Sequence, residues 1–172
     1  MDDVTRKVGS FSAVTLALAI GVFVAVASAQ ELPFQKILPL ELAREAASAA
    51  LAACEAKGYR VSVAVVDGGG HVKVLIKGDG AGPHTLDSSR RKAYTALSLR
   101  RRTSDLVALI AKQPAAAGLR DMNEDILILG GGMPIEAAGE VIGGIGVGGA
   151  PGGEKDEACA RAGIDSIRDR LE

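Results

Sequence analysis

The sequence predicts an α+β fold in which a mainly antiparallel sheet is flanked by helices. The strongest evidence is a pair of Val-rich runs, residues 61–67 and 71–76, separated only by Gly68, Gly69 and Gly70. A short glycine turn between two such runs is typical of a β-hairpin. The remaining strands are not separated one by one by crossover helices, which argues against a doubly wound parallel sheet.

Helical spacing of apolar side chains identifies the elements that flank the sheet. In residues 40–57, small apolar residues recur at intervals of three, one, three, one and three, and Gly58 is a natural stop. This alanine-rich stripe lets the helix lie close to a sheet. Further helices are expected over residues 86–99, from Thr103 or Ser104 to Pro114, and over residues 154–171.

Two more strands are expected in the second half of the chain. Residues 126–129 (ILIL) are too short for a helix and predict a buried strand. The glycines that follow predict a turn over residues 130–134, and residues 141–147 (VIGGIGV) predict the next strand.

Length and charge narrow the class of protein. The 172 residues suit one domain. The chain has 20 Lys and Arg against 21 Asp and Glu, so its net charge of −1 argues against a dedicated nucleic-acid binder. Trp is absent, so the core must consist mainly of Val, Ile, Leu and Ala.

The N-terminus has the order of a secretory signal peptide. Arg6 and Lys7 precede an apolar run over residues 11–27, and Ala-Ser-Ala at residues 27–29 provides a cleavage site. We therefore expect a signal peptide over residues 1–29, a single domain over residues 30–172, and a secreted or periplasmic location. The alternative is a retained membrane anchor, for which the run is at the lower limit of length.

Export gives the two cysteines two possible roles. In an oxidising compartment Cys54 and Cys159 could form a disulfide if their helices pack side by side. The sequence favours the other role, that of two small buried apolar residues.

The glycine-rich loop at residues 77–85 is the first candidate binding segment. Pro83 stands where a dinucleotide-binding loop needs glycine, and the sequence lacks the ending of a phosphate-binding loop. His71 and His84 are the only histidines and do not make a zinc site. A single histidine can nevertheless serve as an axial haem ligand, and the alternative for each is a solvated surface side chain.

A basic helix follows that loop. Arg90, Arg91 and Lys92 open it, residues 100–102 are arginines at its end, and the spacing puts Arg90 and Arg101 on one face. Such a stripe could bind carboxylates or an acidic partner, or could simply be solvated. No Gly-x-Ser-x-Gly motif or recognisable triad supports nucleophilic catalysis.

Five segments together resemble the haem-binding HbpS-like family, also called the GlcG family. They are VAVVDGGGHV (63–72), KGDGAGPHT (77–85), RRKAYTA (90–96), GGGMPI (130–135) and the long glycine-rich run of residues 141–163. The resemblance covers the whole of residues 30–172. It implies a profilin-like fold and a homo-oligomer, often an octamer. It also implies haem binding by some members, with a suggested role in haem degradation.

The resemblance leads us to expect an exported haem-binding protein that sequesters, senses or slowly degrades haem. Some relatives ligate haem through a histidine near the first helix, but this chain has none before His71. We therefore assign His84 as the axial ligand and metal-binding residue. The other expected contacts are Gly82 and Thr85 on the same loop, and Arg91 and Lys92 for the propionates.

Two other functions stay open. Cytoplasmic relatives are associated with glycolate or diol metabolism, so the chain could be an enzyme or accessory protein acting on a small organic acid or aldehyde. It could also be an oligomeric binding module without chemistry, the partner of a sensor or transporter. Whether the chain is an enzyme is not decided by its residues.

Overall fold

Four antiparallel strands form the sheet at the centre of the part that the structure describes. The computed structural model describes residues 34–171, so the expected signal peptide over residues 1–29 lies outside it. The elements in chain order are α1 (Leu40–Glu55), β1 (Ser62–Asp67), β2 (Val72–Lys77), α2 (Thr85–Ser98), α3 (Thr103–Lys112), the 3-10 helix η1 (Pro114–Arg120), β3 (Gly132–Ala137), β4 (Glu140–Gly148), α4 (Gly153–Ile167) and the 3-10 helix η2 (Arg168–Arg170).

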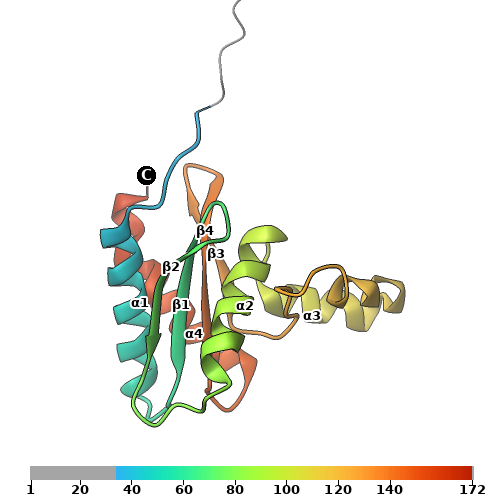
Figure 1. Cartoon of the computed structure of the whole chain (residues 1–172), viewed down its shortest axis with the longest axis horizontal. Coiled ribbons are helices and arrows are strands. Elements are labelled where there is room, and N and C mark those ends of the chain that lie inside the picture. Colours follow the sequence, from blue (N-terminus) through green and yellow to red (C-terminus); the bar gives the residue numbers. More distant parts are fainter. Residues whose placement is uncertain (1–33, 172) are drawn as a thin grey trace, which may run out of the picture. The chain divides into compact units, whose positions relative to one another are not determined.

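The strand order is β2-β1-β4-β3, and every neighbouring pair is antiparallel. The hairpin β1–β2 forms as the glycine turn predicts, and Val65 pairs with Val74 on one side and with Ile145 of β4 on the other. Helices α1 and α4 pack on one face of the sheet, and α2 covers the other (Figure 1). The prediction of an antiparallel sheet flanked by helices is thus confirmed.

The turn of the hairpin is closed by the carboxylate of Asp67. Its Oδ1 accepts hydrogen bonds from the backbone N–H groups of Gly69, at 2.9 Å, and His71, at 3.0 Å. Burial by itself would raise the pKa of Asp67, but these two N–H groups, together with the charges of His71 and Lys73, hold the pKa below its ordinary value.

The main core lies between the sheet and the pair of helices α1 and α4. Ala43, Ala46, Ala47 and Ala50 of α1 are fully buried there, as the alanine stripe predicts. Their small side chains let α1 approach the sheet, and larger side chains from the strands fill the space. The strand and α4 residues of this core include Val63, Val65, Ile135, Ile145, Val147, Ala160 and Ile167.

The opposite face is built differently, because glycines of β4 lie beneath α2. A Cβ atom on Gly146 would stand 2.1 Å from the carbonyl oxygen of Ser89, and one on Gly144 would stand 2.3 Å from that of Ala93. Both distances are far below van der Waals contact. The helix backbone therefore rests directly on the strand backbone, and the apolar cluster on this side is small.

Residues 126–129 do not form the strand that their composition predicts. They run as an irregular extended segment whose backbone is bound by α2: the N–H of Leu127 donates to Oγ1 of Thr95 at 2.7 Å, and the carbonyl of Ile126 accepts from Arg91 at 2.8 Å. The expected turn at 130–134 is also wrong, because β3 begins at Gly132. A Cβ on Gly132 would lie 2.3 Å from the carbonyl oxygen of Lys92, so this glycine allows β3 to pass under α2.

Helix α2 has the length that its sequence predicts but begins and ends one residue earlier, and the predicted arginine stripe does not form. The helix ends at Ser98, and Arg100 adopts a left-handed conformation with φ of 50°. Arg101 therefore leaves the helical face on which Arg90 stands. Arg90 itself pairs with Asp87 and Asp125.

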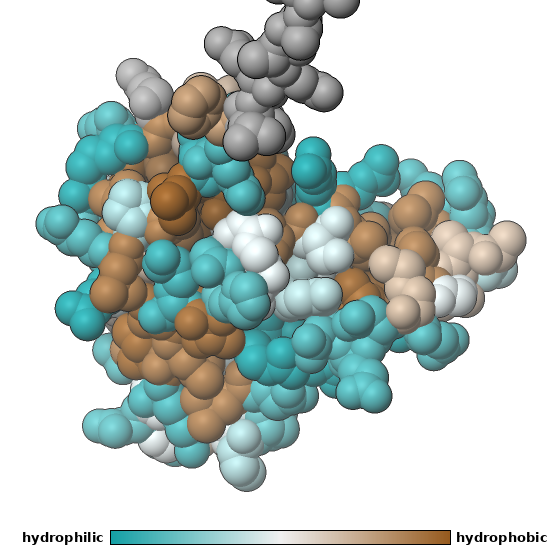
Figure 2. Space-filling view, turned by 45° about the horizontal axis from the view of Figure 1, so that its top comes forward, coloured by the Kyte–Doolittle hydropathy of each residue, from teal (hydrophilic) through white to brown (hydrophobic). Residues whose placement is uncertain are grey.

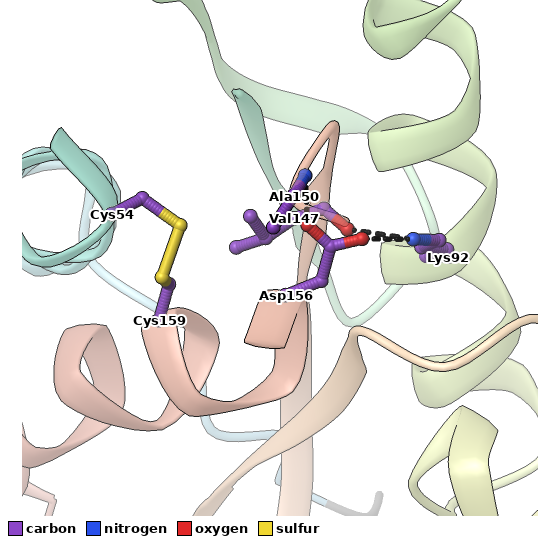
Figure 3. Close-up of a disulfide and its surroundings, with 6 residues drawn as sticks. All are labelled: Cys54, Lys92, Val147, Ala150, Asp156 and Cys159. Carbon is purple, nitrogen blue, oxygen red and sulfur yellow. Dashed lines mark hydrogen bonds and ion pairs between the residues drawn. A yellow bond between two sulfur atoms is a disulfide. The ribbon is translucent and has the colours of Figure 1, made fainter. Parts of the chain in front are cut away.

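Cys54 and Cys159 form a disulfide that joins the end of α1 to the middle of α4 (Figure 3). Both residues are fully buried. Of the two roles left open by the sequence, the structure therefore shows the disulfide, and the two helices do pack side by side.

The surface is mainly a mixture of charged and apolar side chains. Figure 2 shows an apolar area on the side where α1 and β2 lie in Figure 1, and the exposed apolar residues of these two elements are Leu40, Val72 and Leu75. Within residues 34–171, no helix is both long enough and apolar enough to cross a membrane.

The glycine contact between β4 and α2 can be tested by Gly146→Ala. The added methyl group collides with a backbone carbonyl that cannot move alone, so we expect a loss of about 3 kcal/mol in the free energy of unfolding. Denaturant unfolding measures it. Gly118→Ala is the control, because a Cβ there meets nothing within 4 Å. An equal, small effect of both substitutions would contradict the contact.

The disulfide can be tested by replacing Cys54 and Cys159 together with alanine. The bond closes a separation of 105 residues, and loss of such a native disulfide costs about 2–5 kcal/mol. We expect the denaturation midpoint of the double variant to fall by the corresponding amount. Dithiothreitol should lower the midpoint of the original protein and leave that of the variant unchanged. A variant as stable as the original protein would show that the bond does not stabilise the fold.

Candidate functional site

A cavity of about 270 Å³ lies at the end of the sheet where α2 and α4 both begin. The glycine-rich loop before α2, the β4–α4 connection and the segment before β3 meet there. Its wall combines a histidine just before α2, a serine of α2, a buried ion pair and glycine backbone, with two apolar side chains. The lining residues are His84, Ser88, Lys92, Leu129, Gly149, Ala150, Gly152, Gly153 and Asp156.

His84 stands at the rim of this cavity with its side chain exposed. Its imidazole folds back over Gly82: a Cβ on that glycine would lie 2.8 Å from Cε1 of the ring. Gly82 therefore leaves room for the ring but does not itself line the cavity. His71 lies at the other end of strand β1, beside Asp67, so the structure does not bring the two histidines together.

Thr85 does not line the cavity. It is 1% exposed, its hydroxyl donates to the carbonyl of Gly82 at 2.7 Å, and the hydroxyl of Ser62 lies 2.7 Å from it. The bond to Gly82 closes the turn before α2, and the contact with Ser62 ties that turn to strand β1. Thr85 thus fixes the backbone that carries His84 and has no free hydroxyl to offer to a ligand.

Lys92 reaches through the contact between α2 and the sheet to a buried ion pair. Its Nζ lies 2.8 Å from Oδ2 of Asp156 and donates to the carbonyl of Val147 at 2.9 Å (Figure 3). Lys92 is 2% exposed and Asp156 is 3% exposed. The second oxygen of Asp156 accepts the N–H of Ala150 at 2.9 Å. The Lys92 ammonium is therefore already bound by protein partners, and it forms part of the buried wall of the cavity.

Burial controls the protonation of Asp156. Removal from water raises the pKa of this carboxyl, while the Lys92 ammonium and the N–H groups of Ala150 and Gly149 oppose the shift. The raised pKa shows that the carboxylate depends on these partners to stay ionised.

Arg91 also lies outside the cavity wall. Its Nη2 donates to the carbonyl of Ile126 at 2.8 Å, and Nη1 lies 3.7 Å from Oδ2 of Asp87. Its Nε is buried without a hydrogen-bond partner among the described residues. Of the five expected binding residues, the structure thus brings His84 and Lys92 to one cavity, with Gly82 directly behind the imidazole.

Asp156 is the part of the site that sequence reasoning missed. Acidic residues at the start of a helix suit the helix dipole, and this explanation covers Asp156 equally well. A signal was present: Asp156 shares the spacing of the buried positions Ala160, Gly163 and Ile167. A carboxylate on the inward face of a helix needs a buried partner.

The chemistry of the cavity centres on His84. Its imidazole can bind a metal centre or carry a proton without breaking the ion pair beneath it. Across residues 34–171, His, Cys, Asp and Glu side chains do not gather in groups of three or more that could hold a metal ion. The glycines of the β4–α4 connection leave backbone exposed, so a flat group could approach it closely.

Replacing Lys92 with methionine tests the ion pair. It leaves Asp156 buried without its cation, and removal of one partner of such a pair costs about 3–5 kcal/mol at neutral pH. The pKa of Asp156 rises further in this variant. Because the folded pKa then exceeds the unfolded one, the loss should shrink as the pH falls toward about 4.

The double variant Lys92→Met with Asp156→Leu is the control. It removes both charges, so most of the lost free energy of unfolding should return. The remaining loss relative to the original protein should no longer shrink as the pH falls. Denaturant unfolding at several pH values measures both effects. A Lys92→Met variant whose loss grows as the pH falls would contradict this account.

Comparison with known proteins identifies the family of this chain. A family model described as "Haem degrading protein HbpS-like" matches residues 38–165. An uncharacterised 15.0 kDa protein of Citrobacter freundii, from the dhaT-dhaS intergenic region, is 35% identical over 136 residues. The match covers 76% of this chain and 94% of that relative.

Solved structures show the same fold. The crystal structure of a double mutant of HbpS from Streptomyces reticuli has 46% sequence identity and a TM-score of 0.75, and the match covers 82% of this chain and 94% of that one. A crystal structure of PduOC in complex with haem has 25% identity and a TM-score of 0.71, covering 77% and 96%. Since the family model spans most of the chain, the protein belongs to the HbpS-like family of haem degrading proteins.

Proposed function

We propose that this chain is an exported haem-binding protein in which His84 is the axial ligand. The observation that carries the proposal is the position of His84, an exposed imidazole at the rim of a cavity floored by glycine backbone. PduOC, a protein of the same fold, has been crystallised in complex with haem, which supports haem as the molecule that this chain binds. Haem would supply an iron centre to which a neutral imidazole nitrogen binds.

The size of the cavity determines how haem would lie. About 270 Å³ falls just below the ~300–1,000 Å³ of pockets that enclose a drug-sized ligand. Haem would therefore be held against the surface, with one part covered and the rest in water. Leu129, 49% exposed on the cavity wall, offers an apolar contact for the ring. Such a surface mode also suits a chain with few aromatic side chains.

The five expected binding residues divide into different roles under this proposal. His84 binds the iron, Gly82 gives its ring room, and Thr85 holds the loop. Arg91, whose side chain is 30% exposed, is the better placed cation for a propionate. A contact with Lys92 would first require its bond to Asp156 to open, which is costly for a buried pair.

The buried disulfide supports the exported location. Disulfides persist in secreted and periplasmic proteins and are rare in the reducing cytosol. Together with the expected signal peptide over residues 1–29, the bond between Cys54 and Cys159 is consistent with a role in sequestering, sensing or slowly degrading haem outside the cytoplasm.

We extend the proposal to assembly as a homo-oligomer. Helix α3 and η1 project from the rest of residues 34–171 (Figure 1). Val107 on this projection and Met122 just after it are 38% and 54% exposed. Assembly with a second copy of the chain would remove these apolar side chains from water.

A second candidate function uses the same cavity for a small organic acid or aldehyde. The specific observation in its favour is the Lys92–Asp156 pair on the wall of a cavity that also holds His84 and Ser88. This set of polar groups suits a molecule of a few carbon atoms with a carboxylate or carbonyl group. His84 would then exchange a proton with the ligand.

A haem titration of residues 30–172 separates the two candidates. We expect a saturable Soret band at micromolar haem, and at least tenfold weaker binding by His84→Ala because the iron loses its ligand. His71→Ala is the matched control, since that exposed histidine lies outside the cavity, and its affinity should be unchanged.

Each other outcome has a clear meaning. Equal binding by His84→Ala would exclude His84 as the ligand while keeping haem. If no saturable band forms, haem binding is wrong. A small carboxylate that raises the melting temperature of the protein, but not that of His84→Ala, would then favour the second candidate.

A further inference from the structure

A second and larger groove lies at the β3 edge of the sheet, away from His84. Its volume is about 810 Å³. The loop after α2 forms one wall, and the end of α4 with η2 forms the other. Helix α2 has 14 residues, about 21 Å at 1.5 Å per residue, and separates this groove from the His84 cavity at its other end.

The floor of the groove is apolar. Met133 and Leu171 are 7% and 8% exposed, and Pro134 and Ile164 are partly buried beside them. Side chains of this kind cover an apolar ligand body without offering hydrogen bonds. Polar recognition must therefore come from the rim.

The rim carries an excess of positive charge. Arg100, Arg101, Arg102 and Arg168 line the groove together with two acids, Asp105 and Glu136. Two of the arginines are already engaged: Arg102 binds Asp105 and Glu157, and Arg168 pairs with Asp165. Arg100 and Arg101 form no ion pair within residues 34–171.

The backbone at Arg100 is shaped for glycine and not for arginine. The N–H of Arg100 donates to the carbonyl of Leu97 and that of Arg101 to the carbonyl of Ala96, which makes a Schellman motif at the end of α2. Its left-handed position, where Arg100 has φ of 50°, strongly favours glycine. The fold thus tolerates a strained backbone to place this guanidinium at the groove.

We propose that this groove binds an apolar molecule that carries carboxylate groups. The body of the ligand lies on Met133, Pro134, Ile164 and Leu171, and its carboxylates pair with Arg100 and Arg101. Guanidinium groups match carboxylates through paired hydrogen bonds, and the two unpaired arginines are free to make them. Metal-free tetrapyrrole dicarboxylates and long-chain fatty acids share this chemistry. The proposal is independent of the His84 site.

Fluorescence titration with metal-free protoporphyrin IX tests the site, because this probe has no iron for His84 to bind. A parallel titration with palmitate distinguishes the two sources of the ligand. We expect saturable binding of at least one probe, and at least tenfold weaker binding by Arg100→Ser with Arg101→Ser. The dimethyl ester of protoporphyrin, which lacks the charges, should bind equally weakly to both proteins.

Three variants serve as controls. Arg44→Ser with Arg120→Ser removes the same charge from exposed arginines outside the groove, and His84→Ala alters only the other site. Both should bind the probe as the original protein does. Arg100→Gly should weaken binding while raising the denaturation midpoint, because glycine relieves the left-handed strain. A misfolded variant would show the opposite change in stability.

Several results would overturn the proposal. Equal affinity of the Arg100→Ser with Arg101→Ser variant would show that the arginines do not recognise the carboxylates. Equal binding of the ester and the acid would have the same meaning. If neither probe binds, but the variant changes the sedimentation coefficient, the groove is an interface between copies of this chain.

Discussion

The close contact between α2 and the glycine-lined face of β4 determines most of this structure. Where Gly144 and Gly146 lie beneath Ala93 and Ser89, helix and strand backbones touch without side chains between them. A helix held at that height leaves no room for a side chain at these two positions of β4. The first turn of α2, with His84 before it, is thereby placed at one end of the sheet.

The same contact explains how a lysine comes to be buried. Lys92 leaves α2 at the level of the sheet and has no route to water, so its ammonium needs partners in the interior. It finds the carbonyl of Val147 and the carboxylate of Asp156. Helix α4 is therefore fastened on both sides, to α2 by this ion pair and to α1 by the disulfide only three residues later (Figure 3). The wall of the His84 cavity is thus one of the most constrained parts of the molecule.

The features that the sequence predicts well are local. The glycine turn between two Val-rich runs predicts the hairpin, and the alanine spacing predicts α1. In both cases the residues that determine the element are close together in the sequence. Residues 126–129 show the limit. Their apolar composition suits a strand, but their backbone partners are Thr95 and Arg91 of α2, and no local pattern reveals those partners.

The candidate site likewise has a part that local sequence predicts and a part that depends on contacts between distant residues. The loop with Gly82 and His84 stands out by composition, so it could be singled out from the sequence. The pairing of Lys92 with Asp156 joins residues 64 positions apart and depends on the height of α2 over the sheet. The left-handed Arg100 ends α2, whereas the sequence predicts that Arg101 still shares a helical face with Arg90.

The disulfide also determines when the fold can be completed. Cys54 lies on the first helix and Cys159 on the last, 105 residues apart. Because the chain is synthesised from its N-terminus, α1 is complete long before its covalent partner on α4 exists. Both cysteines are fully buried once α1 and α4 pack together, so an oxidant that accepts two electrons from the thiols must reach them before the core closes. Oxidation thus precedes the final packing of these two helices, and a chain truncated before α4 cannot form the bond at all.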